Sequence, residues 1–180
     1  MKRLYLMRHA KSSWAKPGLE DWERPLNQRG RDAAGLLGRH LEDKGACLDV
    51  AICSAAARTM ETLERLLEAY PGSVTGYSDQ SLYLCSGQQL VMALAGLPEK
   101  TQEVLVVAHF PGVQEAALAL AGPGTVGQKI NRLRKKFPTG AIATIEIDGD
   151  SWDASGWRKT KLTDFVTPKT LRQCKPKSPN

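Results

Sequence analysis

The stretch Arg3-Leu4-Tyr5-Leu6-Met7-Arg8-His9-Ala10-Lys11 is a short apolar run that ends in an arginine and a histidine. It predicts a buried β-strand, because it is too short for a helix and polar residues close it. In an open α/β sheet, ligands bind beyond the carboxyl ends of the strands, so Arg8 and His9 are expected where chemistry could be done. Taken alone, the stretch favours a buried, hydrogen-bonded histidine over a catalytic one.

Composition describes an ordinary globular chain. Its 180 residues are 42% hydrophobic and 24% charged, which suits one domain with a core that needs no disulfides. The formal net charge is +6 and the pI is near 9.2, compatible with nucleic acid, an acidic membrane surface or an anionic substrate. Charge alone does not choose among these partners.

Targeting and metal signals are weak. Arg8 interrupts the first apolar run, and no later run approaches the roughly 20 apolar residues of a membrane span. The four cysteines have no metal-type spacing and are expected to be reduced thiols: Cys47, Cys53, Cys85 and Cys174. The basic segment 129–136 lacks the interleaved aromatics of base stacking and is expected to be a solvated face. We therefore predict a cytoplasmic protein with no metal, no cofactor and no membrane or nucleic-acid partner.

Hydrophobic periodicity predicts alternating strands and helices. The expected strands span 3–8, 49–54, 74–77 and 103–109, with a hairpin formed by 141–147 and 157–162. The expected helices span 28–44, about 55–70, 86–97, 113–121 and 129–136. This order predicts an α/β three-layer sandwich with a mostly parallel central sheet, flanking helices and an antiparallel edge hairpin. Residues 1–167 are expected to form a single domain, and residues 168–180 a basic, partly disordered C-terminal tail.

The helix after the second strand carries a candidate binding residue. Ser54 is a plausible N-cap, and Arg58 then lies in the opening turn, beside the positive end of the helix. The alternative is an arginine that is solvated or paired with Glu61 or Glu64. The expected inward stripe of this helix consists of Met60, Leu63, Leu67 and Tyr70.

Three predicted strands lead into helices and end in residues suited to a phosphate: Arg8 with His9, Ser54 with Arg58, and His109. Right-handed crossovers bring the ends of parallel strands to one edge of the sheet. Four cationic or potentially cationic side chains could therefore converge without a metal. Such a cluster suits a phosphoryl group, which carries about two negative charges near pH 7.

These motifs resemble those of the histidine phosphatase superfamily, also called phosphoglycerate-mutase-like. Its "RHG", "SxAxRAxxT" and "GHNPG" motifs appear as Arg8-His9-Ala10, Ser54-x-Ala56-x-Arg58-Thr59-x-x-Thr62 and Ala108-His109-Phe110-Pro111-Gly112. The segments 7–12 and Asp21-x-x-Arg24-Pro25-Leu26-x-x-x-Gly30 are most similar to its SixA-type phosphohistidine phosphatases, as are segments 139–143 and 162–171. The resemblance spans nearly the whole chain in the right order.

The resemblance implies that His9 is the nucleophile and forms a phosphohistidine intermediate. Arg8, Arg58 and His109 would bind the phosphoryl oxygens. Attack requires a neutral imidazole nitrogen, and charge that develops on the oxygens requires fixed donors. A bound phosphate dianion should raise the pKa of His109.

The sequence departs from the family pattern at four positions near these motifs. Ala10 replaces glycine, Ala55 stands where proline is common, Thr59 where alanine is common, and Phe110 where asparagine is common. None of the four charged positions is lost. Phe110 removes a polar contact, so we expect a less hydrophilic pocket.

The loop at 12–25 carries two tryptophans and several acidic residues. Trp14 and Trp22 could line a pocket, but covering the end of the core is the more common role of loop aromatics. Asp21 or Glu20 could supply a proton, although both are expected to be solvated or structural. The segment 81–85, where relatives that act on phosphoesters carry a glutamate acid, has no carboxylate.

Because the acid and any long lid insertion are missing, the sequence favours a metal-independent phosphatase that acts on phosphohistidine in phosphorelay-type proteins. The alternatives are a broad phosphomonoesterase for small phosphorylated substrates, or a phosphate-binding module with little turnover.

Overall fold

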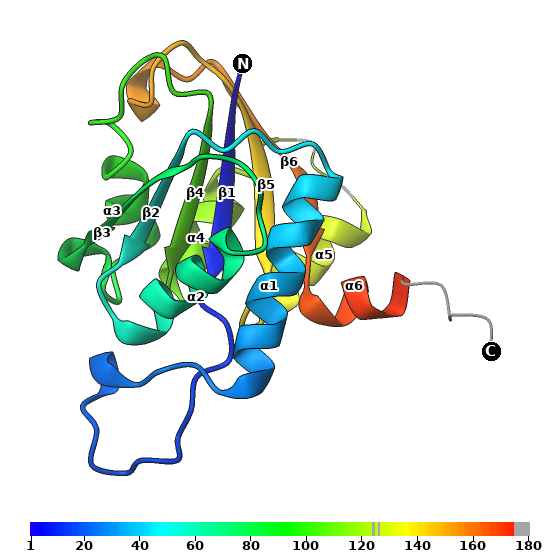
Figure 1. The fold of residues 1–180 in the computed structure, drawn as a ribbon. Helices are drawn as coiled ribbons and strands as arrows, with labels where there is room; N and C mark the ends of the chain where they lie inside the picture. The colour runs from blue at the N-terminus through cyan, green and yellow to red at the C-terminus, as the bar shows by residue number, and fades with distance from the viewer. Residues whose placement is uncertain (124, 126, 175–180) are drawn as a thin grey trace.

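The computed structural model describes residues 1–123, 125 and 127–174. Within them, a six-stranded sheet has the order β3-β2-β4-β1-β5-β6 (Figure 1). Its strands are β1 (Lys2–Arg8), β2 (Val50–Ser54), β3 (Thr75–Asp79), β4 (Glu103–Ala108), β5 (Ile142–Asp148) and β6 (Lys159–Val166). The pairs β1–β4, β2–β4 and β2–β3 are parallel, whereas β5 pairs antiparallel with β1 and with β6. The predicted mostly parallel sheet with an antiparallel edge hairpin is confirmed.

Helices cover both faces of the sheet. They are α1 (Gln28–Asp43), α2 (Ala57–Leu67), α3 (Gly87–Met92), α4 (Gly112–Ala119), α5 (Gln128–Lys135) and α6 (Pro168–Cys174), with short 3-10 turns η1 (Asp21–Glu23), η2 (Gln80–Leu82) and η3 (Ala154–Gly156). One buried cluster joins α1 and α2 to the sheet, and another joins α3, α4 and α5 to it. These two cores produce the three layers (Figure 1). No helix in the described ranges combines the length and the apolar character needed to cross a bilayer.

The central strands are apolar because they are buried on both faces. Every residue of β2 is buried, and in β4 only Glu103 is not. Such strands read as continuous hydrophobic runs rather than as alternating patterns. This is why β1, β2 and β4 could be located from sequence to within a residue or two.

The inward face of α2 matches the predicted stripe except at Met60. Met60 is 47% exposed, whereas Leu66 is fully buried and Thr59 and Thr62 also point inward. Leu63 and Tyr70 of the predicted stripe are buried and Leu67 packs against the same core, so the prediction is wrong at Met60 alone. The two buried threonines share this inward face with the apolar residues. Their hydroxyls are hydrogen-bonded, which allows them to be buried.

The chain beyond residue 167 begins with a helix. Residues 168–174 form α6, which packs beside α1 through Leu171. Residues 175–180 of the predicted tail lie outside the described residues.

Candidate active site

The structure brings Arg8, His9, Arg58 and His109 to one edge of the sheet; we call these four residues the basic cluster. The ring centroids of His9 and His109 are 5.4 Å apart. Arg58 Nη2 lies 3.3 Å from His109 Nδ1. His9, Arg58 and His109 are each less than a tenth exposed. Residues that are 100 positions apart in sequence thus form one contiguous group.

Sheet pairing explains this convergence. β1 and β4 are adjacent and parallel, with Arg8 opposite Ala108, and the His9 N–H donates to the Ala108 carbonyl at 3.0 Å. β2 pairs with the other side of β4, with Cys53 opposite Val107, so its last residue, Ser54, lies level with the end of β4 at Ala108. Because all three strands run in the same direction, the residues that follow them emerge side by side.

The protonation of His9 follows from its surroundings. Its Nδ1 lies 2.7 Å from the carbonyl oxygen of Ala10, which can only accept a hydrogen bond. Burial, followed by the charge of Arg58, lowers the His9 pKa to about 3 despite that bond. At neutral pH the ring is therefore neutral, with its proton on Nδ1 and a lone pair on Nε2.

His109 is held as the opposite tautomer. Arg58 can only donate, so His109 Nδ1 accepts, and Nε2 carries the proton that it donates to Ser54 Oγ at 2.8 Å. Burial and then the Arg58 charge lower the His109 pKa to about 4. The prediction of Ser54 as the N-cap of α2 is wrong: the N-cap is Ala56, which makes no side-chain cap. The Ser54 hydroxyl instead orients an imidazole.

Asp21 joins the basic cluster to its surrounding loops. One of its carboxylate oxygens accepts from Arg58 Nη2 at 2.9 Å and from the Tyr83 hydroxyl at 2.7 Å, and the other accepts from Arg24 Nη1 at 2.7 Å. The hydrogen bond from Tyr83, with Arg58 and Arg24 adding to it, lowers the Asp21 pKa. Arg58 thus pairs with Asp21, rather than with Glu61 or Glu64.

Sequence reasoning noted Asp21 but did not place it in the site, and it missed Tyr83. The Asp21-x-x-Arg24 spacing is a signal for the first, because both charges lie at one short turn. Tyr83 has no comparable signal: it lies in the segment 81–85, whose sequence predicts only that a carboxylate is missing. The Tyr83 ring also meets His109 edge-on, with the ring centroids 5.2 Å apart.

Arg8 is fixed by the backbone. Its Nη1 donates to the Phe137 carbonyl at 2.9 Å, and its buried Nε has no hydrogen-bond partner within the described part of the chain. The ring of Phe110, 45% exposed, lies 5.2 Å from the Arg8 guanidinium carbon. An aromatic ring thus lies against this cation at the position where the family commonly has asparagine, and the less hydrophilic pocket stays a prediction.

Two threonines brace the motif segments. Thr62 Oγ1 accepts from the Ala10 N–H at 3.0 Å and donates to the Arg58 carbonyl, so it ties the end of β1 to α2. Thr59 Oγ1 donates to the carbonyls of Ser54 and Ala56. The family's usual alanine at position 59 could not make these bonds.

Neither loop tryptophan covers the core as expected. Trp14 is 73% exposed and stacks on Arg24, with the guanidinium carbon 3.2 Å from the ring centroid. Trp22 is 49% exposed and lines a surface hollow.

Comparisons with known proteins agree with this arrangement. The family model of the histidine phosphatase superfamily (branch 1) matches residues 4–78. An uncharacterized protein of Mycobacterium leprae (strain TN) is 30% identical over 166 residues, 91% of this chain and 100% of that protein.

Two solved structures are similar over nearly the whole chain. A candidate phosphohistidine phosphatase SixA from Nakamurella multipartitia has a TM-score of 0.80 and 27% identity, covering 93% of this chain and 96% of that one. A similarly described SixA from Agrobacterium tumefaciens has a TM-score of 0.74 and 27% identity, covering 93% and 98%. Since fold, motif order and sequence likeness coincide along the chain, it belongs to the SixA type of the histidine phosphatase superfamily.

Proposed function

We propose that this protein is a metal-independent phosphatase that removes phosphate from phosphohistidine on phosphorelay-type proteins, with His9 as the nucleophile. The observation that carries the proposal is the protonation of His9. Its Nδ1 is engaged by a backbone carbonyl, so the lone pair on Nε2 is available for attack at neutral pH.

In the first step, the His9 Nε2 lone pair attacks phosphorus, and the bond between phosphorus and the substrate nitrogen breaks. The departing imidazole keeps that electron pair and leaves neutral once a proton has been taken up on the substrate. In the second step, water attacks the phosphorus of phosphorylated His9. Inorganic phosphate departs with the water oxygen, one proton is released and His9 returns to its neutral form.

The other members of the basic cluster would stabilise charge on the phosphoryl oxygens. Arg58 and Arg8 are fixed guanidinium donors, and the Arg8 Nε, which has no hydrogen-bond partner among the described residues, can donate a further bond. The Nδ1 of His109 becomes a further donor once the bound dianion has raised its pKa.

The substrate class follows from the weakness of nearby acids. Asp21, the carboxylate beside Arg58, is ionised through its pairing with two arginines and Tyr83. Burial, together with the Asp21 hydrogen bond, raises the pKa of Tyr83. An alkoxide is a far stronger base than imidazole, and the difference between the two leaving groups bounds the acid's task at roughly 13 kcal/mol. Phosphoramidates, which need little help in leaving, are therefore favoured over alkyl phosphoesters.

Cytoplasmic location is part of the proposal. The thiols of Cys47, Cys53 and Cys85 are free, as expected in a reducing compartment.

A substrate panel tests the function. Purified protein should release phosphate from a histidine-phosphorylated carrier much faster than from sugar phosphates, and His9→Ala should abolish the release. Faster turnover of sugar phosphates would favour the broad phosphomonoesterase instead. A rapid quench into alkali, in which phosphohistidine persists, should trap phosphate on His9. Binding of the carrier without any trapped phosphate or turnover would favour a phosphate-binding module.

A further inference from the structure

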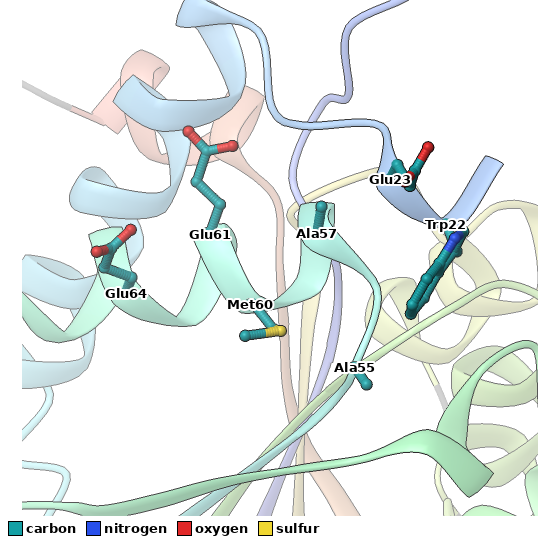
Figure 2. Close-up of a pocket in the computed structure, with 7 residues that line it drawn as sticks. All are labelled: Trp22, Glu23, Ala55, Ala57, Met60, Glu61 and Glu64. Carbon is teal, nitrogen blue, oxygen red and sulfur yellow. The ribbon is translucent and has the colours of Figure 1, made fainter. Parts of the chain in front are cut away.

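A hollow of about 670 Å³ lies beside the basic cluster and is lined on opposite sides by η1 and by the start of α2 (Figure 2). Trp22 and Met60 supply its apolar surface and are 49% and 47% exposed. Exposed aromatic and methionine side chains that share one concave surface are typical of binding sites for other molecules. We call this hollow the acidic groove, because all three charged residues that line it are glutamates: Glu23, Glu61 and Glu64.

The acidic groove is continuous with the basic cluster through the backbone. Trp22 follows Asp21, which pairs with Arg58, and Ala57 on the other wall immediately precedes Arg58. Ala55 directly follows Ser54, the hydrogen-bond partner of His109. A molecule whose phosphate is held by the basic cluster therefore has this groove next to it.

The charges of the groove are unequally compensated. Glu61 bonds to Arg31 Nε at 2.6 Å and to the Leu26 N–H at 2.7 Å, so its role is partly structural. Glu64 is 62% exposed and lies 3.9 Å from Arg65, a loose surface pair. The groove thus keeps net negative charge in a chain whose overall charge is +6. It would attract cations next to a cluster that attracts anions.

We propose that the acidic groove binds the polypeptide that flanks the phosphorylated residue, and that it selects segments in which an apolar side chain neighbours lysine or arginine. The apolar side chain would contact Trp22 and Met60, and the cation would face Glu23 and Glu64. An extended chain advances about 3.5 Å per residue, so one to three flanking residues suffice to occupy a hollow adjacent to the phosphate. This inference rests on the proposed function and names the chemistry of its protein substrates.

The test uses two peptides that carry a phosphoryltriazole analogue of phosphohistidine, which cannot be hydrolysed. One has a leucine and a lysine on each side of the analogue; the other has glutamate in place of each lysine. Fluorescence anisotropy at low salt should show that the wild-type protein binds the lysine peptide about tenfold more tightly, as expected for two exposed charge pairs replaced by repulsions.

Two variants of α2 make the result specific. Glu64→Lys should reduce the preference to about twofold, whereas Glu68→Lys, the same charge change one helical turn beyond the groove, should leave it near tenfold. Equal binding of the two peptides by the wild type, or equal effects of the two variants, would overturn the groove proposal. Hydrolysis of inorganic phosphoramidate, which is too small to reach the groove, is measured in parallel. If that hydrolysis is absent while the peptide preference persists, the proposed function fails and the groove proposal stands.

Discussion

Lowering the pH from 8 to 5 should destabilise the folded protein through the two imidazoles of the basic cluster. The pKa values of His9 and His109 are lowered to about 3 and about 4, chiefly by burial, whereas an unfolded histidine titrates near 6.5. As the pH falls through 6.5, the unfolded chain takes up protons that the folded chain does not. The contribution of the two neutral imidazoles to the free energy of unfolding is therefore fully present above pH 6.5. It is lost progressively as the pH falls toward 3 to 4.

The size of the effect follows from the same values. At pH 5, each imidazole favours the unfolded chain by about 2 kcal/mol, so the pair contributes about 4 kcal/mol. Urea unfolding of the wild type and of His9→Gln at pH 8 and pH 5 measures the share of His9. The variant should lose about 2 kcal/mol less than the wild type between the two pH values. Carboxylates and His40 titrate in both proteins, so their contributions cancel in this comparison.

An equal loss in the two proteins would refute the argument. It would mean that the His9 ring titrates near 6.5 in the folded chain, and hence that it is not a buried neutral imidazole. Nitrogen-15 chemical shifts of the His9 ring supply a second check, since they should report a protonated Nδ1 and a bare Nε2 down to pH 5.

Three further predictions concern the basic cluster and the side chains that contact it. Ser54→Ala should destabilise the protein by about 1–3 kcal/mol in urea unfolding, because the buried His109 N–H loses its acceptor; a change below about 0.5 kcal/mol would contradict this contact. Asp21→Asn should bind tungstate about three- to tenfold more tightly by calorimetry, since Arg58 is then less neutralised; weaker binding would show that Asp21 mainly holds Arg58 in place. Tungstate binding at pH 6 should take up a fraction of a proton, seen as a dependence of the heat on buffer ionisation, and His109→Gln should remove that uptake; an uptake unchanged in the variant would assign the proton to another group.

Much of the fold could be predicted because its signals are local. The runs that became β1, β2 and β4 are apolar over most of their length, and such strands need only burial to be recognised. The convergence of Arg8, His9, Arg58 and His109 then followed from one topological rule, that parallel strand ends share an edge.

What sequence could not provide was the pairing of side chains across loops. The position of Ser54 before a helix predicts an N-cap, but its hydroxyl accepts a hydrogen bond from the imidazole of His109, 55 positions away. Asp21 and Tyr83 come from loops whose paths no periodicity fixes, and they meet at Arg58 only in three dimensions. The hydrophobicity of Met60 predicts a place in the core, yet its side chain lines the acidic groove.

The contact between His9 Nδ1 and the Ala10 carbonyl bears on how this chain can vary over generations. The group that fixes the ring is part of the main chain and is the same whichever amino acid is encoded at codon 10. A point mutation there can crowd the neighbourhood, but it cannot delete the oxygen. Glycine and alanine can thus replace each other at position 10 while the His9 ring keeps its orientation. His109 depends on the side chain of Ser54, so one nucleotide change can remove the group that orients its ring.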